Sequence, residues 1–272
     1  MGRYPQFLKG SLTIFLFLPP FNLLNLVQLP LEKSQNIVAL KKFNNNAEKL
    51  NLRGSLIAIC GIDGSGKTTQ VELLSKYLAS RGVKFKRLWF RWVAFFSYPF
   101  LALCRLLGYT KWKTASRSNI RYAEHSFYRN SALAKLWPWL FTIDAIIHSF
   151  LQIKARRILS YTILCDRFIP DILVDLMCET KDYRLPKRIV GRMLLSLIPK
   201  DSRLIIIDVT EDTAYNRKHD TPSINYLKER RKIYLALAKA LNIPVVDGEM
   251  GLADVHINIL RLLGLGLEED VL

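Results

Sequence analysis

The apolar and polar positions beyond residue 50 follow a pattern that predicts an α/β domain. Short apolar runs of strand type recur near residues 55–60, 84–90, 161–165, 203–209 and 243–247. Because these runs are apolar at nearly every position rather than at alternate ones, they indicate strands covered on both faces. Residues 69–79 place apolar side chains three and four apart, which predicts an amphipathic helix after the first strand. We therefore expect a three-layer α/β fold with a five-stranded parallel sheet flanked by helices.

The first 50 residues follow a different pattern and are interpreted as an N-terminal extension, with the α/β domain spanning residues 51–272. Residues 10–27 are the most membrane-like part of the chain, but two consecutive prolines and two asparagines interrupt the apolar run. A spanning helix needs about 20 mostly apolar residues. Three interpretations stay open: an appendage that is loose or packed on the domain, a peripheral membrane contact through residues 1–30, or a misplaced start.

Composition adds a strong basic charge to this picture. The chain has 40 Lys and Arg against 23 Asp and Glu, a formal net charge of +17. Such a balance favours polyanionic partners, namely nucleotides, nucleic acid or an anionic membrane surface, although a generally basic surface would also explain it. None of the four cysteines forms a C-x-x-C pair, so a zinc ribbon or redox pair is not indicated. We expect a reducing, cytoplasmic environment.

A glycine-rich motif lies between the first strand and the first helix of the domain. Residues 61–69 read GIDGSGKTT, which fits G-x-x-x-x-G-K-T in its required strand–loop–helix context. Gly61, Gly64 and Gly66 let the backbone bend so that successive amides point inward, where they and the helix N-terminus can cradle a triphosphate. Lys67 would span the β- and γ-phosphates, and Thr68 would offer its hydroxyl to magnesium.

This motif predicts an ATP- and Mg²⁺-dependent phosphotransferase with a P-loop kinase fold. Its candidate cofactor-binding residues are Gly61, Asp63, Gly64, Ser65, Gly66, Lys67, Thr68 and Thr69.

The loop and two later segments resemble those of thymidylate kinases. That family carries an acidic residue at the position of Asp63, and it ends its third strand with a motif similar to Asp166-Arg167-Phe168. Residues 204–218 resemble its next strand and the helix before its lid. The segment that ends at Asp247 resembles its last strand and the turn beside the adenine. Together the matches run in order from about residue 56 to residue 263.

The resemblance implies a role for each matching residue. Asp63 would approach a sugar hydroxyl of the acceptor, Asp166 would hold the magnesium shell together with Thr68, and Arg167 would bind the acceptor phosphate. Arg217 would stabilise charge on the transferring group, and Asp247 would bind the nucleotide. The implied catalytic residues are therefore Lys67, Asp166, Arg167 and Arg217.

The acceptor side departs from that family. The segment after the second strand lacks the family's Arg-Glu-Pro-Gly-Gly sequence, Asp171 stands where the family has a serine, and the lid lacks the usual arginine cluster. In exchange, basic and aromatic residues that suit a nucleotide occur between strands two and three. They are Arg87, Arg91, Arg117, Arg121 and Arg129 with Trp89, Trp92, Tyr122 and Tyr128.

Two further features of this region are an apolar segment and a pair of histidines. Residues 92–107 are apolar on nearly every face, so they must be buried, paired in a homodimer or placed on a membrane. His125 and His148 have no ligand partner four residues away, which favours structural roles over metal binding.

The favoured function is transfer of the γ-phosphoryl group of ATP to a nucleoside monophosphate, with dTMP as the preferred acceptor. A kinase for another acceptor, such as a nucleoside or another phosphorylated metabolite, is the second hypothesis. An ATP-dependent module that contacts nucleic acid or membrane is the third. Nucleotides are thus the expected partners, and nucleic acid is disfavoured.

Overall fold

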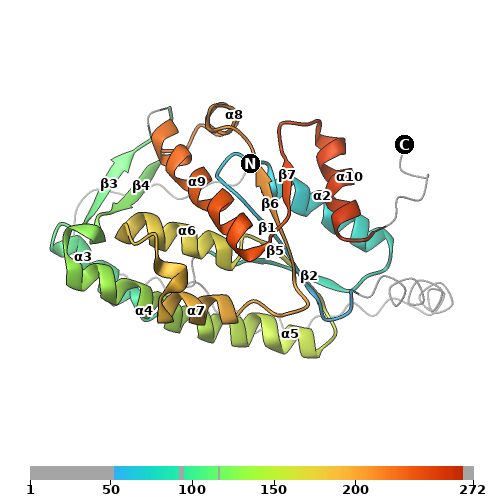
Figure 1. The fold of residues 1–272 in the computed structure, drawn as a ribbon, viewed down its shortest axis with the longest axis horizontal. Coiled ribbons are helices and arrows are strands. Elements are labelled where there is room, and N and C mark those ends of the chain that lie inside the picture. The colour runs from blue at the N-terminus through green and yellow to red at the C-terminus, as the bar shows by residue number, and fades with distance from the viewer. Residues whose placement is uncertain (1–51, 92–94, 116, 266–272) are drawn as a thin grey trace. The chain divides into compact units, whose positions relative to one another are not determined.

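A five-stranded parallel sheet forms the centre of the domain (Figure 1). The computed structural model describes residues 52–91, 95–115 and 117–265, so the interpretations of residues 1–50, and the boundary after them, lie outside the described residues. The strand order is β2-β5-β1-β6-β7. The strands are β1 (Leu56–Cys60), β2 (Phe85–Trp89), β5 (Thr162–Asp166), β6 (Arg203–Asp208) and β7 (Val245–Asp247). All five predicted strands are confirmed to within two residues.

Two hydrophobic cores cover the two faces of the sheet, which gives the predicted three layers. In β1, Leu56, Ala58 and Cys60 face one core, whereas Ile57 and Ile59 face the other. The side chains of a strand alternate between its faces, so a run that is buried on both sides must be apolar throughout. This is the reason why the strands appear in the sequence as continuous apolar runs.

More helices cover one face of the sheet than the other. The smaller core packs under α2 (Lys67–Ser80) and α10 (Leu252–Leu262). The larger core packs under helices that follow the other strands. They are α3 (Ser97–Leu106), α4 (Ser131–Ser149), α6 (Ile169–Thr180), α7 (Ile189–Ser196) and α9 (Ile224–Leu241). In the described part of the chain, the short helices are α5 (Ala155–Ile158), α8 (Glu211–Arg217) and the 3₁₀ turns η2 (Phe127–Arg129) and η4 (Leu185–Lys187).

The connection between β2 and β5 contains structure that the sequence pattern did not predict. A two-stranded antiparallel hairpin, β3 (Thr110–Thr114) with β4 (Arg121–His125), stands apart from the main sheet. In β3 lysines alternate with threonine and tryptophan, and Thr110 is the one buried residue among the ten residues of the two strands, so no apolar run marks the strands. After it, α4 continues through the π-helical η3 (Phe150–Lys154) into α5.

The two histidines of this region pack against aromatic rings. His125 shares a hydrogen bond of 3.0 Å with the Thr110 hydroxyl and stacks on Phe127. Burial lowers its pKa to about 4, so the ring is neutral at physiological pH. His148 makes an edge contact with Phe90, and burial, with Arg156 nearby, lowers its pKa as well. The four cysteines are free and buried.

Candidate active site

The phosphate loop joins β1 to α2 and is shaped by its glycines. Gly61, Gly64 and Gly66 have φ values of 142°, 86° and 87°, which side chains with a Cβ rarely adopt. A Cβ on Gly61 would lie 2.5 Å from the carbonyl oxygen of Ile207 in β6. A Cβ on Gly64 would collide with the carbonyl of Ala214 in α8. The loop therefore requires glycine for its backbone conformation at all three positions, and for close packing at Gly61 and Gly64.

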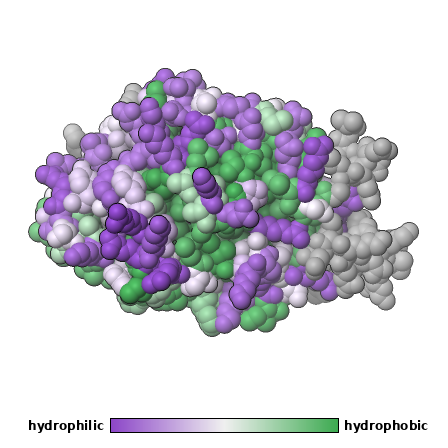
Figure 2. Space-filling model, viewed as in Figure 1, coloured by the Kyte–Doolittle hydropathy of each residue, from purple (hydrophilic) through white to green (hydrophobic). Residues whose placement is uncertain are grey.

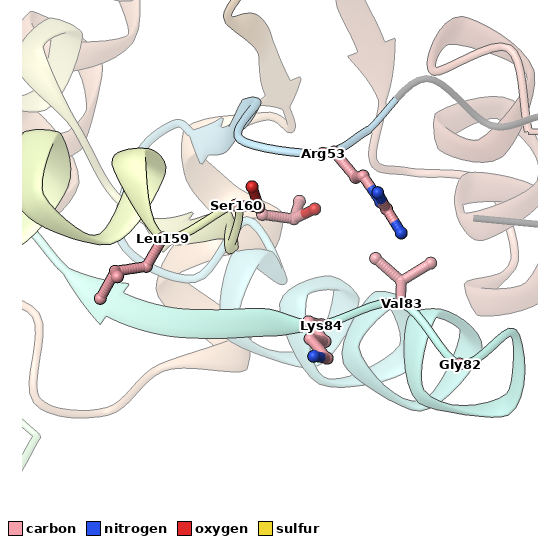
Figure 3. Close-up of a pocket in the computed structure, with 7 residues that line it drawn as sticks. Arg53, Gly82, Val83, Lys84, Leu159 and Ser160 are labelled. Carbon is pink, nitrogen blue, oxygen red and sulfur yellow. The ribbon is translucent and has the colours of Figure 1, made fainter. Parts of the chain in front are cut away.

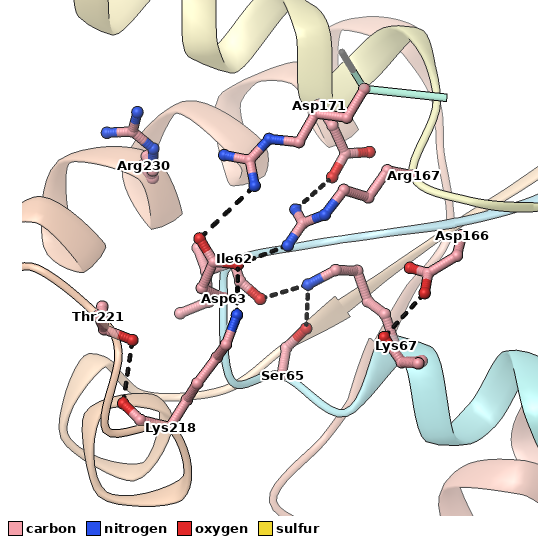
Figure 4. Close-up of polar contacts among 12 residues, drawn as sticks. Ile62, Asp63, Ser65, Lys67, Asp166, Arg167, Asp171, Lys218, Thr221 and Arg230 are labelled. Carbon is pink, nitrogen blue, oxygen red and sulfur yellow. Dashed lines mark hydrogen bonds and ion pairs between the residues drawn. The ribbon is translucent and has the colours of Figure 1, made fainter. Parts of the chain in front are cut away.

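Lys67 begins α2 and its side chain lies back along the loop (Figure 4). Its Nζ donates to the carbonyl oxygen of Ile62 at 2.5 Å and to Ser65 Oγ at 3.3 Å. Only 4% of the residue is exposed. Burial, reinforced by the charge of Arg167, lowers the pKa of Lys67 to about 7. The Lys67 amine thus lies at the loop, where the negative charge of a bound ligand would favour its protonation.

Thr68 and Asp166 meet at the carboxyl ends of β1 and β5. The Thr68 hydroxyl donates to Asp166 Oδ2 at 2.8 Å, and the register pairs Ile59 with Asp166. Magnesium prefers hard oxygen ligands, and it is usually held by one or two protein oxygens together with substrate phosphates and water. Within the described residues no group of three or more His, Cys, Asp or Glu forms a self-sufficient metal cluster. This pair fits a metal shared with a nucleotide.

Arg167, directly after β5, is fixed by two carboxylates (Figure 4). Its Nη2 donates to Asp63 Oδ1 at 2.5 Å, and its Nη1 donates to Asp171 Oδ1 at 3.1 Å. Asp171 also accepts hydrogen bonds from the Tyr234 hydroxyl and from the backbone N–H of Phe168. The φ of Arg167 is 75°, unusual for a residue other than glycine. Such strain persists where the surroundings fix the residue, and it is common at functional sites.

Asp63 belongs to a wider network of charges beside the loop. Its carboxylate also lies 3.4 Å from Lys218 Nζ and 3.8 Å from Arg91 Nη1. Burial alone would raise the pKa of Asp63, but Arg167 and then Arg91 hold it well below its usual range. Asp63 is therefore ionised, and it links the phosphate loop to cations from three other segments of the chain.

The network extends to α6 and α9 through Asp175. Arg91 donates to both carboxylate oxygens of Asp175, at 2.7 and 3.0 Å, and Arg230 reaches the same group at 3.2 Å. The Arg230 guanidinium lies 3.6 Å from the ring centre of Tyr226. Sequence reasoning missed these α9 residues. The signal was present, because Tyr226, Arg230 and Tyr234 are spaced by four and share one helix face.

A small hollow beside Asp175 holds a second carboxyl group. Arg91, Trp137, Asp175 and Glu179 are among its lining residues. The Trp137 indole N–H donates to Glu179 Oε2 at 2.7 Å. Burial, then the charge of Asp175, raises the pKa of Glu179 to about 8. This group, which the sequence pattern did not indicate, is largely protonated at neutral pH.

Other predicted residues lie farther along the sheet edge. Arg217, the last residue of α8, donates to the carbonyl oxygen of Gly248 at 3.1 Å, whereas Lys218, directly after the helix, reaches Asp63. Asp247 accepts a hydrogen bond from the backbone N–H of Glu249 in the same turn. Thr69 is exposed on the first turn of α2. Arg217 and Asp247 thus make their contacts at the turn that follows β7, outside the network around Asp63.

The basic and aromatic candidates between β2 and β5 separate in the structure. Arg91 joins the site, whereas Arg87, Arg121 and Arg129 are exposed. The Arg117 guanidinium lies 4.1 Å from the ring centre of Tyr215. Trp92 lies outside the described residues.

A different pocket lies at the opposite edge of the sheet, near the amino ends of the strands (Figure 3). It is lined by Arg53, Gly82, Val83, Lys84, Leu159, Ser160 and Thr162. None of the predicted site residues is among them. The candidate site is therefore the cluster at the carboxyl ends of the strands, where ligands of open α/β sheets bind.

The fold and the glycine loop define the class: this is a three-layer α/β domain with a parallel sheet and a glycine-rich loop of P-loop type between β1 and α2. No family model matches the sequence. Among solved structures, the chain is similar to a thymidylate kinase from Ehrlichia chaffeensis, with 20% sequence identity and a TM-score of 0.45. The similarity covers 78% of this chain and 99% of that one.

Proposed function

We propose that the protein transfers the γ-phosphoryl group of ATP to a nucleoside monophosphate, with dTMP as the preferred acceptor. The observation that carries the proposal is the ion pair between Asp63 and Arg167, which joins the phosphate-binding loop to the candidate acceptor side. Phosphoryl transfer needs mainly positioning and charge stabilisation. A loop suited to the donor and an arginine suited to the acceptor, held together by one carboxylate, meet that need.

The donor side fits a magnesium-bound triphosphate. The three glycines with positive φ permit the close backbone approach that such a loop requires. Thr68 and Asp166 would hold the metal through the hydroxyl and carboxylate oxygens that lie 2.8 Å apart. When bound, Mg²⁺ would neutralise charge on the phosphates. Lys67 would place its ammonium at the β- and γ-phosphates by exchanging its bond to Ile62 for bonds to the ligand.

The acceptor side is rich in paired charges. The carboxylates of Asp63, Asp171, Asp175 and Asp220 are paired with Arg91, Arg167, Arg230 and Lys218. Four carboxylates thus balance four cations, and Lys67, at the loop beside them, adds a further basic group. Such a site favours an anionic acceptor over a neutral one, because a guanidinium can bind phosphate in two-point contacts. This supports a monophosphate and disfavours a free nucleoside.

Asp63 would bind and orient the acceptor rather than remove its proton. Its low pKa makes it a weak base. Phosphoryl transfer to a phosphate oxygen has little need of a strong base. A carboxylate this close to the loop is suited to accept a hydrogen bond from a sugar hydroxyl while it keeps Arg167 in position.

A panel of acceptors with radiolabelled ATP tests the proposal. We expect dTMP to be phosphorylated fastest, with turnover dependent on magnesium. Lys67→Ala serves as the control for contaminating kinases. If every monophosphate is inert while an unphosphorylated compound is turned over, the acceptor assignment is wrong. Absence of ATP binding by the wild-type protein would refute the donor assignment as well.

A further inference from the structure

The positive charge of the chain is concentrated in one segment. Between Leu73 and Cys165 there are sixteen Lys and Arg but only two acidic residues, Glu124 and Asp144. Both acidic groups already have partners. Glu124 lies 2.6 Å from Lys113 Nζ, and Asp144 is buried at the N-terminus of α3. Nine of the sixteen cations lie on α3, on the hairpin with its turn (residues 110–125), or on the helix from α4 to α5, and the others lie at η2 and on or beside α2 and β2.

The same segment exposes a long apolar helix face. From residue 136 to residue 151, every described residue in the exposed class is apolar. These residues, the apolar face, are Leu136, Trp139, Ile143, Ile147, Phe150 and Leu151, between 41% and 60% exposed. Their spacing of three and four places most of them along one side of the helix. Figure 2 shows hydrophobic residues reaching the surface along the lower edge, where Figure 1 places α4 and α5.

The other side of this helix belongs to the core. Trp137, Phe141 and Ala145 are buried in the larger hydrophobic cluster. The helix Ser131–Ile158 is long and apolar enough to cross a membrane by length and composition, but 44% of its most apolar window is buried inside the domain. A helix that is fixed in the core on one side can offer only its other side to a partner.

Aromatic rings and lysines border the apolar face. Asp144, in the middle of α4, accepts hydrogen bonds of 2.8 Å from the backbone N–H groups of Phe95 and Phe96. These two exposed rings therefore lie beside the helix. Lys135 and Lys154, both exposed, lie at its two ends. Apolar and aromatic side chains between basic residues are the composition of a helix that lies in a membrane interface.

We propose that the apolar face docks on the surface of an anionic lipid bilayer, with the helix Ser131–Ile158 lying in the plane of the interface. Its hydrophobic side chains would enter the boundary between headgroups and acyl chains, while Lys135 and Lys154 contact lipid phosphates. A second copy of the chain fits this face less well. Two facing copies would bring their lysines together, and Asp144, the acidic residue of this helix, is buried.

Vesicle sedimentation of the full-length protein tests the proposal. We expect binding to vesicles of equal parts phosphatidylcholine and phosphatidylglycerol, and much weaker binding to phosphatidylcholine alone or at high salt. Phe150→Glu with Leu151→Glu, the most exposed pair of the face, should weaken binding about tenfold or more. Lys135→Gln and Lys154→Gln should each weaken it about fivefold, which corresponds to about 1 kcal/mol.

The matched control is Leu235→Glu with Leu262→Glu, which changes two exposed leucines on α9 and α10 outside the basic segment. The control should bind vesicles like the wild type, and all variants should keep its thermal unfolding midpoint. Failure of the wild type to bind would overturn the proposal. So would vesicle binding that survives both sets of changes in folded variants, since another part of the chain would then be responsible. Light scattering that shows a dimer, dissociated by Phe150→Glu with Leu151→Glu, would assign the face to a second copy.

Discussion

Asp63 Oδ1 lies 2.5 Å from Nη2 of Arg167, although 104 residues separate the two in the sequence. Asp63 belongs to the loop after β1, and Arg167 follows β5, the neighbouring strand. Parallel strands bring their carboxyl ends to one edge of the sheet, which is why two motifs so distant along the chain can share one ion pair. The pair couples the position of the donor loop to that of the arginine proposed to bind the acceptor.

Arg167→Ala should impair the acceptor step in particular. We expect a higher KM for dTMP and a lower kcat, with the KM for ATP little changed, because the lost guanidinium contacts the acceptor phosphate. The loss should be roughly 2–5 kcal/mol in kcat/KM for dTMP if the site is desolvated. Steady-state kinetics with each substrate varied in turn measure both effects.

The control for that measurement is Arg121→Ala, which removes an exposed arginine from the hairpin. Arg167→Lys should recover part of the activity, since it restores charge without the two-point geometry. An equal rise in the KM values of ATP and dTMP would show that Arg167 only supports the loop.

Asp166→Asn should raise the magnesium concentration needed for half-maximal activity by about 10- to 100-fold. The amide keeps the size of the side chain and can still accept from Thr68, but it removes the charge that attracts the metal. Asp182→Asn, a surface carboxylate paired with Arg188, is the matched control. A magnesium titration that overlays that of the wild type would make Asp166 a structural residue.

The sequence predicted the sheet and the donor loop better than it predicted the acceptor side. Strands buried on both faces leave continuous apolar runs, and the loop leaves a fixed spacing around Lys67, so both have local signatures. The β3–β4 hairpin has neither, because only one of its ten strand residues is buried. Its pairing depends on contacts that the pattern of apolar positions does not encode.

The charge network depends on contacts between distant segments. Asp171 was recognised only as a departure from a serine, yet it fixes Arg167 and binds Tyr234. Arg230 contacts Asp175 from a helix that begins 49 residues later. Which cation meets which carboxylate depends on how α6 packs on α9, and no short motif reports this packing. Arg217 and Lys218 are adjacent in the sequence, yet one contacts Gly248 and the other Asp63.

Glu179→Gln should flatten the pH dependence of stability. The folded-state pKa of Glu179, about 8, is above its usual 4.5. Between these values the folded state holds a proton that the unfolded state releases, so the stability of the wild type falls as pH rises through this window. Glutamine keeps an acceptor for Trp137 without the ionisation cost.

We expect the stability advantage of the Glu179→Gln protein over the wild type to grow as pH rises from 5 to 8, by about 3–4 kcal/mol at most. Urea unfolding across this range measures it. Glu124→Gln on the hairpin is the control. A stability difference independent of pH would mean that Glu179 does not titrate in this window.

Lys67→Ala should lower kcat about 100- to 1,000-fold, by analogy with the loss of one preorganised donor to a charged transition state.

The same substitution should also remove a proton-linked component of ATP binding. The pKa of Lys67 in the protein is about 7, because burial and then Arg167 disfavour the ammonium. At about pH 8, most molecules have a neutral Lys67 amine. A bound triphosphate would favour protonation of this amine. Phosphate groups, with a second pKa of about 6, are already ionised at that pH. ATP binding should therefore take up about one proton per site, and ATP affinity should fall as pH rises above 7. Calorimetry in two buffers of different ionisation enthalpy measures the uptake. Lys76→Ala, which changes an exposed lysine of the same helix, should leave both kcat and proton uptake unchanged. The assignment of Lys67 would fail if the Lys67→Ala protein bound ATP with the same uptake.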